Sequence, residues 1–170
     1  MRHSTDPHGR LAGADRTSVR CVARRVARGQ GDLRFPAGII GHPDVRRFLD
    51  WDQPIGLLLC GILHHFTDSE RPEELTETLC RALPSGSYVF IHHLLDSGDA
   101  AIADVQAAFR EGLGRGQFRT WAQVTKMFSG LELVEPGLVL VPEWRPDAGT
   151  PSARDLPVLR LACAGVARKP

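Results

Sequence analysis

The sequence lacks the short motifs that mark several common enzyme classes. It contains no Gly-x-Gly-x-x-Gly segment and no phosphate-binding loop, so neither of these nucleotide-binding fingerprints is present. No serine or cysteine lies in a nucleophile-elbow motif, which excludes the hydrolases built on that motif. Asparagine is absent altogether, and only two of the 21 basic residues, Lys126 and Lys169, are lysine. Such a bias is typical of GC-rich coding sequence.

Long apolar runs and a strong net charge are absent as well. The longest apolar run has about ten residues, too few to span a bilayer, and the N-terminus contains no apolar segment of a secretory signal. The formal net charge is only +1, so bulk electrostatics favours neither nucleic acid nor an anionic membrane. We therefore expect no membrane and no nucleic acid among the partners.

Cysteines are few and widely separated. The chain has four, Cys21, Cys60, Cys80 and Cys163, and no two are close enough in sequence to suggest a zinc knuckle or a redox pair. Cys60 and Cys80 lie within apolar patterns, so we expect them in the core. This usage indicates a reducing, cytoplasmic compartment.

Charge divides the chain into two parts. Residues 1–30 hold seven Arg and two Asp, whereas residues 31–170 hold 14 basic and 18 acidic side chains. Residues 1–28 also show little apolar periodicity, so we expect a disordered basic leader there and a folded domain over residues 29–170. A nucleic-acid-binding arm is the alternative for the leader, but no aromatic residues are interleaved for base stacking.

An apolar strand followed by a helix and a second strand forms the centre of the predicted fold. Ile55–Leu63 is a continuous apolar run, typical of a strand buried on both faces of a sheet. A helix is predicted from Asp68 or Ser69, with leucines four residues apart on one face, and Ser87–Leu94 is rich in strand-forming residues. These three elements predict a βαβ unit.

Later elements complete an α/β pattern. A helix with Ile102, Val105 and Phe109 on one face is followed by a short helix that opens at the capping box Thr120–Gln123. Short strands are expected at 131–134 and 138–141, around the turn Pro136-Gly137, and a last strand at 158–167. The order of elements predicts an open, doubly wound α/β sheet with an appended antiparallel strand pair.

Two histidine pairs follow the predicted central strands. His64 and His65 come after the first strand, and His92 and His93 end the second. Because ligands of such sheets bind beyond the carboxyl ends of the strands, at least one histidine is a candidate for catalysis or substrate contact. Metal ligation with Asp68 or Asp96 is a second possibility, although the spacing matches no standard zinc motif. Hydrogen-bonded structural histidines are the third.

A turn carries one further candidate. Asp32 lies in the turn-like segment Gly31–Arg34. Its carboxylate is suited to accept a hydrogen bond from an adenine-type amine, and a role as a turn or helix cap is the alternative.

Several segments together resemble one bacterial family, the S-adenosylmethionine-dependent methyltransferases once catalogued as a domain of unknown function. The resemblance covers roughly residues 29–170 and implies a class I Rossmann-like methyltransferase sheet, S-adenosylmethionine as cofactor and a small-molecule methyl acceptor. It rests on GDLR at 31–34, HPDVRRFLDWDQPIGLLLCGILHHF at 42–66, LPSGSYVFIHH at 83–93 and GLELVEPGLVLVPEWRPD at 130–147.

The resemblance also implies roles for single residues. Asp32 and Leu33 match the acidic motif that contacts the adenine of the cofactor, and Leu63 and His64 match the motif near the methyl group. His93 matches a histidine at the end of the following strand. The resemblance therefore implies that Asp32, Leu33 and Leu63 bind cofactor and that His64 or His93 deprotonates the acceptor.

The chain departs from the family pattern ahead of GDLR. Family members carry there a first strand with a glycine-rich loop and a second strand that ends in an acid, and residues 1–28 contain neither. We therefore expect a partial sheet that lacks its first two strands, weak cofactor binding, and an unpaired edge on the strand at 55–63. Two alternatives stay open: a non-catalytic subunit or homo-oligomer that pairs through this edge, and a metal-dependent hydrolase that uses the histidine pairs.

Overall fold

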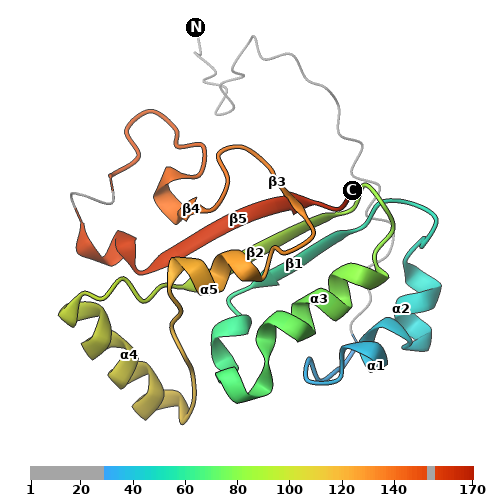
Figure 1. Cartoon of the computed structure of the whole chain (residues 1–170), viewed down its shortest axis with the longest axis horizontal. Helices are drawn as coiled ribbons and strands as arrows, with labels where there is room; N and C mark the ends of the chain where they lie inside the picture. Colours follow the sequence, from blue (N-terminus) through green and yellow to red (C-terminus); the bar gives the residue numbers. More distant parts are fainter. Residues whose placement is uncertain (1–28, 153–155) are drawn as a thin grey trace, which may run out of the picture.

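The fold centres on one mixed sheet, seen in a computed structural model that describes residues 29–152 and 156–170. The predicted leader, residues 1–28 with Cys21, lies outside the described residues. The sheet has five strands in the order β1-β2-β5-β3, and β4 also pairs with β5 (Figure 1). The strands are β1 (Gly56–Cys60), β2 (Tyr88–Leu94), β3 (Glu132–Leu133), β4 (Val139–Leu140) and β5 (Ala162–Arg168).

Three of the helices begin at a side-chain cap, and one of these caps, Thr120–Gln123, is predicted from the sequence. The ring of His42 accepts a hydrogen bond from the Asp44 amide, and Thr120 and Gln123 form the expected capping box. Asp99 caps a third helix through the Ala101 amide. The helices are α1 (Pro36–Ile40), α2 (Pro43–Phe48), α3 (Pro72–Ala82), α4 (Ala100–Leu113) and α5 (Trp121–Lys126), with 3₁₀ turns at Leu63–His65, Asp68–Glu70, Val141–Glu143 and Pro157–Arg160.

The predicted βαβ unit is confirmed. β1 and β2 pair in parallel and α3 connects them, so the carboxyl ends of both strands lie at the same edge of the sheet. β5 then pairs with β2 in the antiparallel direction. The structure is thus a mixed α/β sheet of the kind expected.

The first strand is shorter than its apolar run. β1 ends at Cys60, because Gly61 adopts a left-handed conformation (φ 65°) that turns the chain into the 3₁₀ turn Leu63–His65. Cys80 is buried as expected, but the prediction that Cys60 is a core residue is wrong: its side chain is exposed. Cys60 alternates with the buried Leu59 and therefore points to the opposite face of the sheet.

The late strands are arranged around β5. β3 and β4 both pair with β5, and in the described part of the chain neither pairs with the other. β5 is seven residues long, so its free edge accommodates both two-residue strands in succession. The last strand begins at Ala162, later than predicted, because Pro157–Arg160 forms a 3₁₀ turn.

The hydrophobic core lies on one face of the sheet only. Leu59, Val89 and Ile91 project from this face against residues of α3 and α5, which lie on the same side of the strands (Figure 1). Within residues 29–152 and 156–170, no helix covers the opposite face in the way a doubly wound sheet requires. In α4 Ile102 is buried as predicted, whereas Val105 is 42% exposed, contrary to the prediction.

No helix among the described residues is long and apolar enough to cross a membrane.

Candidate functional site

The two histidine pairs meet at the carboxyl ends of β1 and β2. Parallel pairing places Cys60 opposite His92, so the turn after β1 lies beside the end of β2. The ring centroids of His64 and His93 are 5.8 Å apart, and those of His64 and His65 are 4.6 Å apart. The parallel register of β1 and β2 therefore brings the two histidine pairs together.

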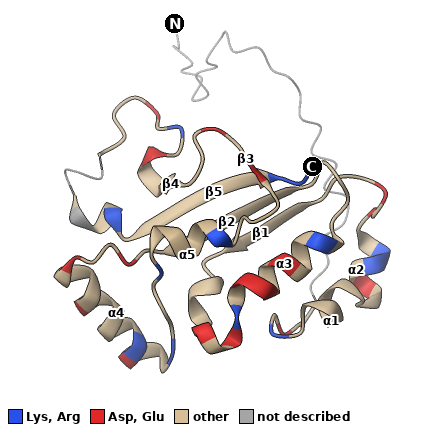
Figure 2. Ribbon diagram, viewed as in Figure 1, with Lys and Arg blue, Asp and Glu red and all other residues tan. Residues whose placement is uncertain are grey.

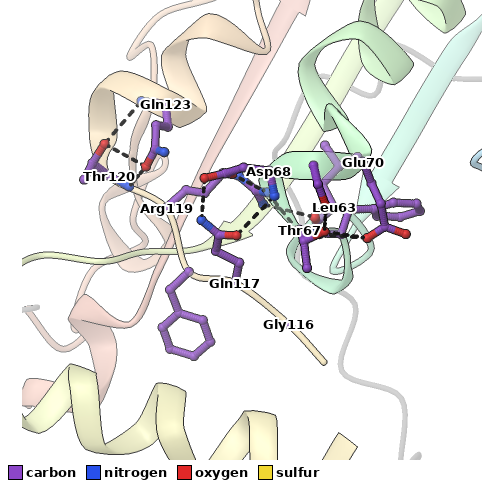
Figure 3. A network of polar contacts seen from close by, with 12 residues as sticks. Leu63, Thr67, Asp68, Glu70, Gly116, Gln117, Arg119, Thr120 and Gln123 are labelled. Carbon is purple, nitrogen blue, oxygen red and sulfur yellow. Dashed lines mark hydrogen bonds and ion pairs between the residues drawn. The ribbon is translucent and has the colours of Figure 1, made fainter. Parts of the chain in front are cut away.

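A buried arginine ties these elements together. Arg119 follows α4 in the chain and is fully buried. Its guanidinium donates to the carbonyl oxygen of Leu63 (3.3 Å) and to Oδ1 of Asp68 (3.0 Å), both labelled in Figure 3. It also donates to the carbonyl oxygen of Phe66 (2.8 Å). The charge is thus balanced by one carboxylate, while the main chain of the turn after β1 is held in place.

Two hydrogen bonds, one to a carbonyl oxygen and one from the same guanidinium, fix which nitrogen of His93 carries the proton. Nδ1 of His93 lies 2.7 Å from the carbonyl oxygen of Leu94, which can only accept, so Nδ1 carries the proton. Nε2 then accepts from Nη1 of Arg119 at 3.2 Å. Burial lowers the pKa of His93 to about 4. His93 is therefore a neutral imidazole with both nitrogens engaged.

His64 is buried but keeps one nitrogen free. Its side chain is 6% exposed, and its Nδ1 has no hydrogen-bond partner among the described residues. Burial, reinforced by neighbouring positive charge, lowers the pKa of His64 to about 4. At neutral pH this ring is uncharged and can donate or accept one further hydrogen bond.

His92 lies beside His64 around a glycine. A Cβ added at Gly61 would lie 3.7 Å from Cε1 of His64 and 3.9 Å from Nδ1 of His92, so both rings border the same point. Nδ1 of His92 is also buried and lacks a partner in the described part of the chain. Burial again lowers the pKa of His92. Two imidazole rings, each with a buried nitrogen that lacks a partner, thus border Gly61.

A second set of polar contacts anchors the same turn from the segment before Arg119. Gln117 donates to Oδ2 of Asp68 at 2.7 Å and accepts from the Asp68 amide at 3.2 Å (Figure 3). Arg115 binds Glu70 at 2.7 Å and the carbonyl oxygen of His65 at 2.8 Å. The capping box Thr67–Glu70 closes the turn locally. Asp68 is therefore committed to Arg119 and Gln117 rather than to a metal.

An aromatic side chain of α4 covers the histidines. The ring of Phe109 lies 5.4 Å from His64 and 5.6 Å from His65, measured between centroids. Gly116 permits this position: a Cβ there would approach Cε1 of Phe109 to 2.5 Å. α4 therefore lies beyond the carboxyl ends of the strands with Phe109 pointing at the site.

The three residues expected to contact a cofactor differ in how exposed they are. Asp32 is surface-exposed, and Arg34 engages both of its carboxylate oxygens at 2.6–3.0 Å. This hydrogen bonding lowers the pKa of Asp32. Leu33 packs against the hydrophobic core, and Leu63 is fully buried in it. Of the three, only Asp32 presents polar side-chain atoms to solvent.

The structure gives no support to the hypothesis of a metal-dependent hydrolase. The described residues contain no group of three or more His, Cys, Asp or Glu side chains placed to hold a metal ion.

The sequence reasoning missed Arg119 entirely. Arg119 stands between Phe118 and the capping residue Thr120, where no motif singles it out. Only the parallel pairing of β1 and β2, together with the return of the chain after α4, brings it under the turn at 63–68.

Comparison with known proteins places the chain in a family. A sequence profile described as S-adenosyl methyltransferase matches residues 21–170. A crystal structure from Thermobifida fusca YX, described as a candidate methyltransferase, has 38% identity and a TM-score of 0.74 over 82% of this chain and 52% of that chain. A duf574 family protein from Streptomyces avermitilis MA-4680 has 34% identity and a TM-score of 0.71 over 82% of this chain and 53% of that chain.

These relatives are longer than the part that this chain matches. The chain spans about half the length of each of the two solved structures. No curated protein matches it. Because the profile covers most of the sequence and the shared fold comes with more than 30% identity, the chain belongs to the S-adenosyl methyltransferase family.

Proposed function

We propose that this chain takes part in methyl transfer from S-adenosylmethionine to a small-molecule acceptor. Family membership supports the reaction class. The single observation that points to the reacting position is His64, which is buried at the carboxyl end of β1 with a free Nδ1. Ligands of α/β sheets bind at this edge.

The polar groups present fit one part of the cofactor. The carboxylate of Asp32 is ionised, because hydrogen bonds from Arg34 hold its pKa down, and it retains lone pairs for an adenine-type amine. Leu33 packs against the hydrophobic core, and Leu63 is buried within it, so Leu63 contributes through its main chain and its packing rather than through an exposed side chain. In this proposal Asp32, Leu33 and Leu63 hold the cofactor, which supplies the methyl group when bound.

We assign different roles to the two candidate catalytic histidines. In this proposal the buried, unpartnered Nδ1 of His64 accepts a hydrogen bond or proton from an acceptor hydroxyl or amine that enters the site. A pKa of about 4 makes it a weak base, so orienting the nucleophile is its main contribution. His93 has both nitrogens engaged, so its part is to position Arg119 and the turn after β1.

Titration with S-adenosylhomocysteine, followed by NMR of the histidine ring resonances, tests the proposal. We expect the His64 signals to move and those of His42, the cap of α2, to stay unchanged. Asp32→Ala should weaken the interaction several-fold, whereas Asp44→Ala, which alters another exposed acid, should not. Unmoved His64 signals at saturating ligand would rule out this placement of the methyl group.

Isothermal titration addresses the strength of binding. In this proposal the cofactor contacts come only from Asp32, Leu33 and Leu63, because residues 1–28 contain no glycine-rich loop, so we expect affinity weaker than micromolar for the 170-residue chain. Micromolar or tighter binding would contradict the view that this chain holds a partial site.

We also place the protein in the cytoplasm, as its thiols at Cys60, Cys80 and Cys163 are free.

The second candidate function is that of a non-catalytic subunit. β1 is the end strand of the sheet order, and among the described residues only β2 pairs with it. Such an edge favours pairing with a homologue or with a second copy of the chain. Light scattering coupled to size exclusion distinguishes these cases, because a monomer in the absence of partners argues against self-association.

A further inference from the structure

Two buried imidazole nitrogens at the carboxyl ends of β1 and β2 have no hydrogen-bond partner. Within residues 29–152 and 156–170, four buried side-chain nitrogens lack a partner, and two of them are Nδ1 of His64 and Nδ1 of His92. Buried polar groups are normally hydrogen-bonded, so two free nitrogens beside the same glycine suit a ligand that both can bind. The proposed methyl transfer involves His64 and His93, and it gives His92 no part.

The space beside Gly61 has room for one atom. Apart from the residues that adjoin Gly61 in the chain, the atoms nearest to its Cβ position are Cε1 of His64 at 3.7 Å and Nδ1 of His92 at 3.9 Å. These are ordinary contact distances, so an atom fits there without displacing either ring. Nδ1 of His64 is bonded to Cε1, so an oxygen slightly nearer the rings can reach hydrogen-bond distance of both nitrogens.

The hydrogen bonds available in this space come from neutral rings. β1 and β2, which lead into the site, contain no charged residue, as Figure 2 shows. Burial lowers the pKa of both His64 and His92, so at neutral pH each ring carries a proton on one nitrogen only. His93 and Asp68 do not compete for a ligand, because both nitrogens of the one and both carboxylate oxygens of the other are already hydrogen-bonded.

We propose that His64 and His92 together bind the hydroxyl group of the methyl acceptor beside Gly61. Nδ1–H of His92 donates to the hydroxyl oxygen, and the hydroxyl group donates its hydrogen to the bare Nδ1 of His64. The oxygen keeps a second lone pair, which leaves it free to act as the nucleophile. Resting on the proposed methyl transfer, this assignment narrows the acceptor to an alcohol or a phenol.

Other nucleophiles do not satisfy both nitrogens. An amine nitrogen has one lone pair, so a hydrogen bond accepted from His92 occupies the pair that has to attack. A carboxylate has no hydrogen to donate to His64, which leaves that nitrogen buried without a partner. Of these three groups, only a hydroxyl donates one hydrogen bond, accepts another and still has a lone pair.

NMR of the 170-residue chain with isotope-labelled histidine tests the proposal. Long-range proton–nitrogen spectra identify the protonated ring nitrogen, and we expect it to be Nδ1 in His92 and Nε2 in His64. Phenol is the probe, because the aromatic ring of Phe109 lies 5.4 Å from the ring of His64. It should shift both Nδ1 signals and bind about tenfold more tightly than aniline, which places an amine on the same ring. Benzoate should shift neither signal.

A matched pair of variants isolates the contribution of His92. His92→Phe keeps a ring in place but removes the donor, so phenol should lose its preference over aniline. His42→Asn removes a histidine at the start of α2, where asparagine can also cap the helix, and should leave the preference unchanged.

Three outcomes overturn the proposal. One is a wild-type chain in which His92 carries its proton on Nε2, because its Nδ1 then cannot donate; this measurement needs no variant. The others are equal affinities for phenol and aniline, and a preference for phenol that persists in His92→Phe. The measurements contain no cofactor. If S-adenosylhomocysteine moves the His64 signals while phenol shows no preference, the hydroxyl assignment fails and the methyl-transfer proposal stands.

Discussion

Nη1 of Arg119 lies 3.2 Å from Nε2 of His93, deep in the protein and between the turn after β1 and the end of β2. A permanently charged guanidinium donates here to a neutral imidazole whose other nitrogen donates to the Leu94 carbonyl. Because Arg119 also donates to the carbonyl oxygen of Leu63, it joins the end of β2 to the turn that carries Leu63 and His64 and holds that turn in one position.

Replacement of Arg119 should be costly. Arg119→Met leaves the carbonyl oxygens of Leu63 and Phe66 and Nε2 of His93 buried without donors, and we expect a loss of about 3 kcal/mol in the free energy of unfolding. Arg115→Met, at a half-exposed arginine on the same turn, should cost no more than about 1 kcal/mol. Urea denaturation measures both, and equal losses would show that Arg119 has no special position.

Stability should fall in mild acid. His64 and His93 have a pKa of about 4 in the folded protein, below the ordinary value of 6.5. Between these two values the unfolded chain binds more protons, so the free energy of unfolding decreases as the pH falls from 6.5 towards 4 and is unaffected by these groups above that window. Each pKa unit corresponds to about 1.4 kcal/mol per group, so the total loss is on the order of a few kcal/mol.

An NMR titration checks the cause of this loss. Both rings should remain neutral at pH 6, and His64→Gln should flatten the dependence of the free energy of unfolding on pH over the same window. Protonation of either ring with a midpoint near 6.5 would contradict the prediction.

Lys169 should stabilise the end of α3. Its ammonium donates to the carbonyl oxygens of Cys80, Arg81 and Leu83, the last of them at 2.6 Å, where the helix dipole is negative. Lys169→Met should therefore lower the free energy of unfolding by about 1–2 kcal/mol. The other lysine provides the control: Lys126→Met, at an exposed position in α5, should change it by less than about 0.5 kcal/mol.

Gly116 should govern the contact between α4 and the histidines. Gly116→Ala places a methyl group 2.5 Å from Phe109 and should displace this ring from His64 and His65. Gly114→Ala also places a methyl group at a left-handed residue, with nothing within 4 Å, although its φ of 69° is less strained than the φ of 135° at Gly116. It should therefore weaken stability by about 1 kcal/mol without moving the ring. Ring-to-ring NOEs between Phe109 and the two histidines distinguish the two variants.

Much of the fold follows from local patterns. Three local patterns predict their elements: the apolar run before His64, the capping box that begins at Thr120, and the strand-forming residues of β2. They succeed because propensity, capping and periodicity act over a few residues. The sequence-based predictions fail where the ends of a strand or its pairing partner are not set by the pattern within that strand. β1 ends at Cys60 because Gly61 turns the chain, and β3 and β4 pair with β5 because its edge is long enough for both.

The candidate site shows the same division. Sequence reasoning proposes His64 and His93 from their places after two strands, and the parallel register brings the two rings to 5.8 Å. It contains no signal for Arg119, whose partners are more than 20 residues away in the chain, nor for the free nitrogen of His92 beside Gly61.

By itself, then, the sequence determined the α/β order, the helix caps, the two histidine pairs and the family, because these depend on residues close together in the chain or on matching patterns. The tertiary structure alone decided that Arg119 engages His93, that His64 keeps a free nitrogen, and that Leu58 of the strand β1 is exposed. Those outcomes depend on which distant segments share the limited buried space and hydrogen-bonding groups, and no local pattern encodes that competition.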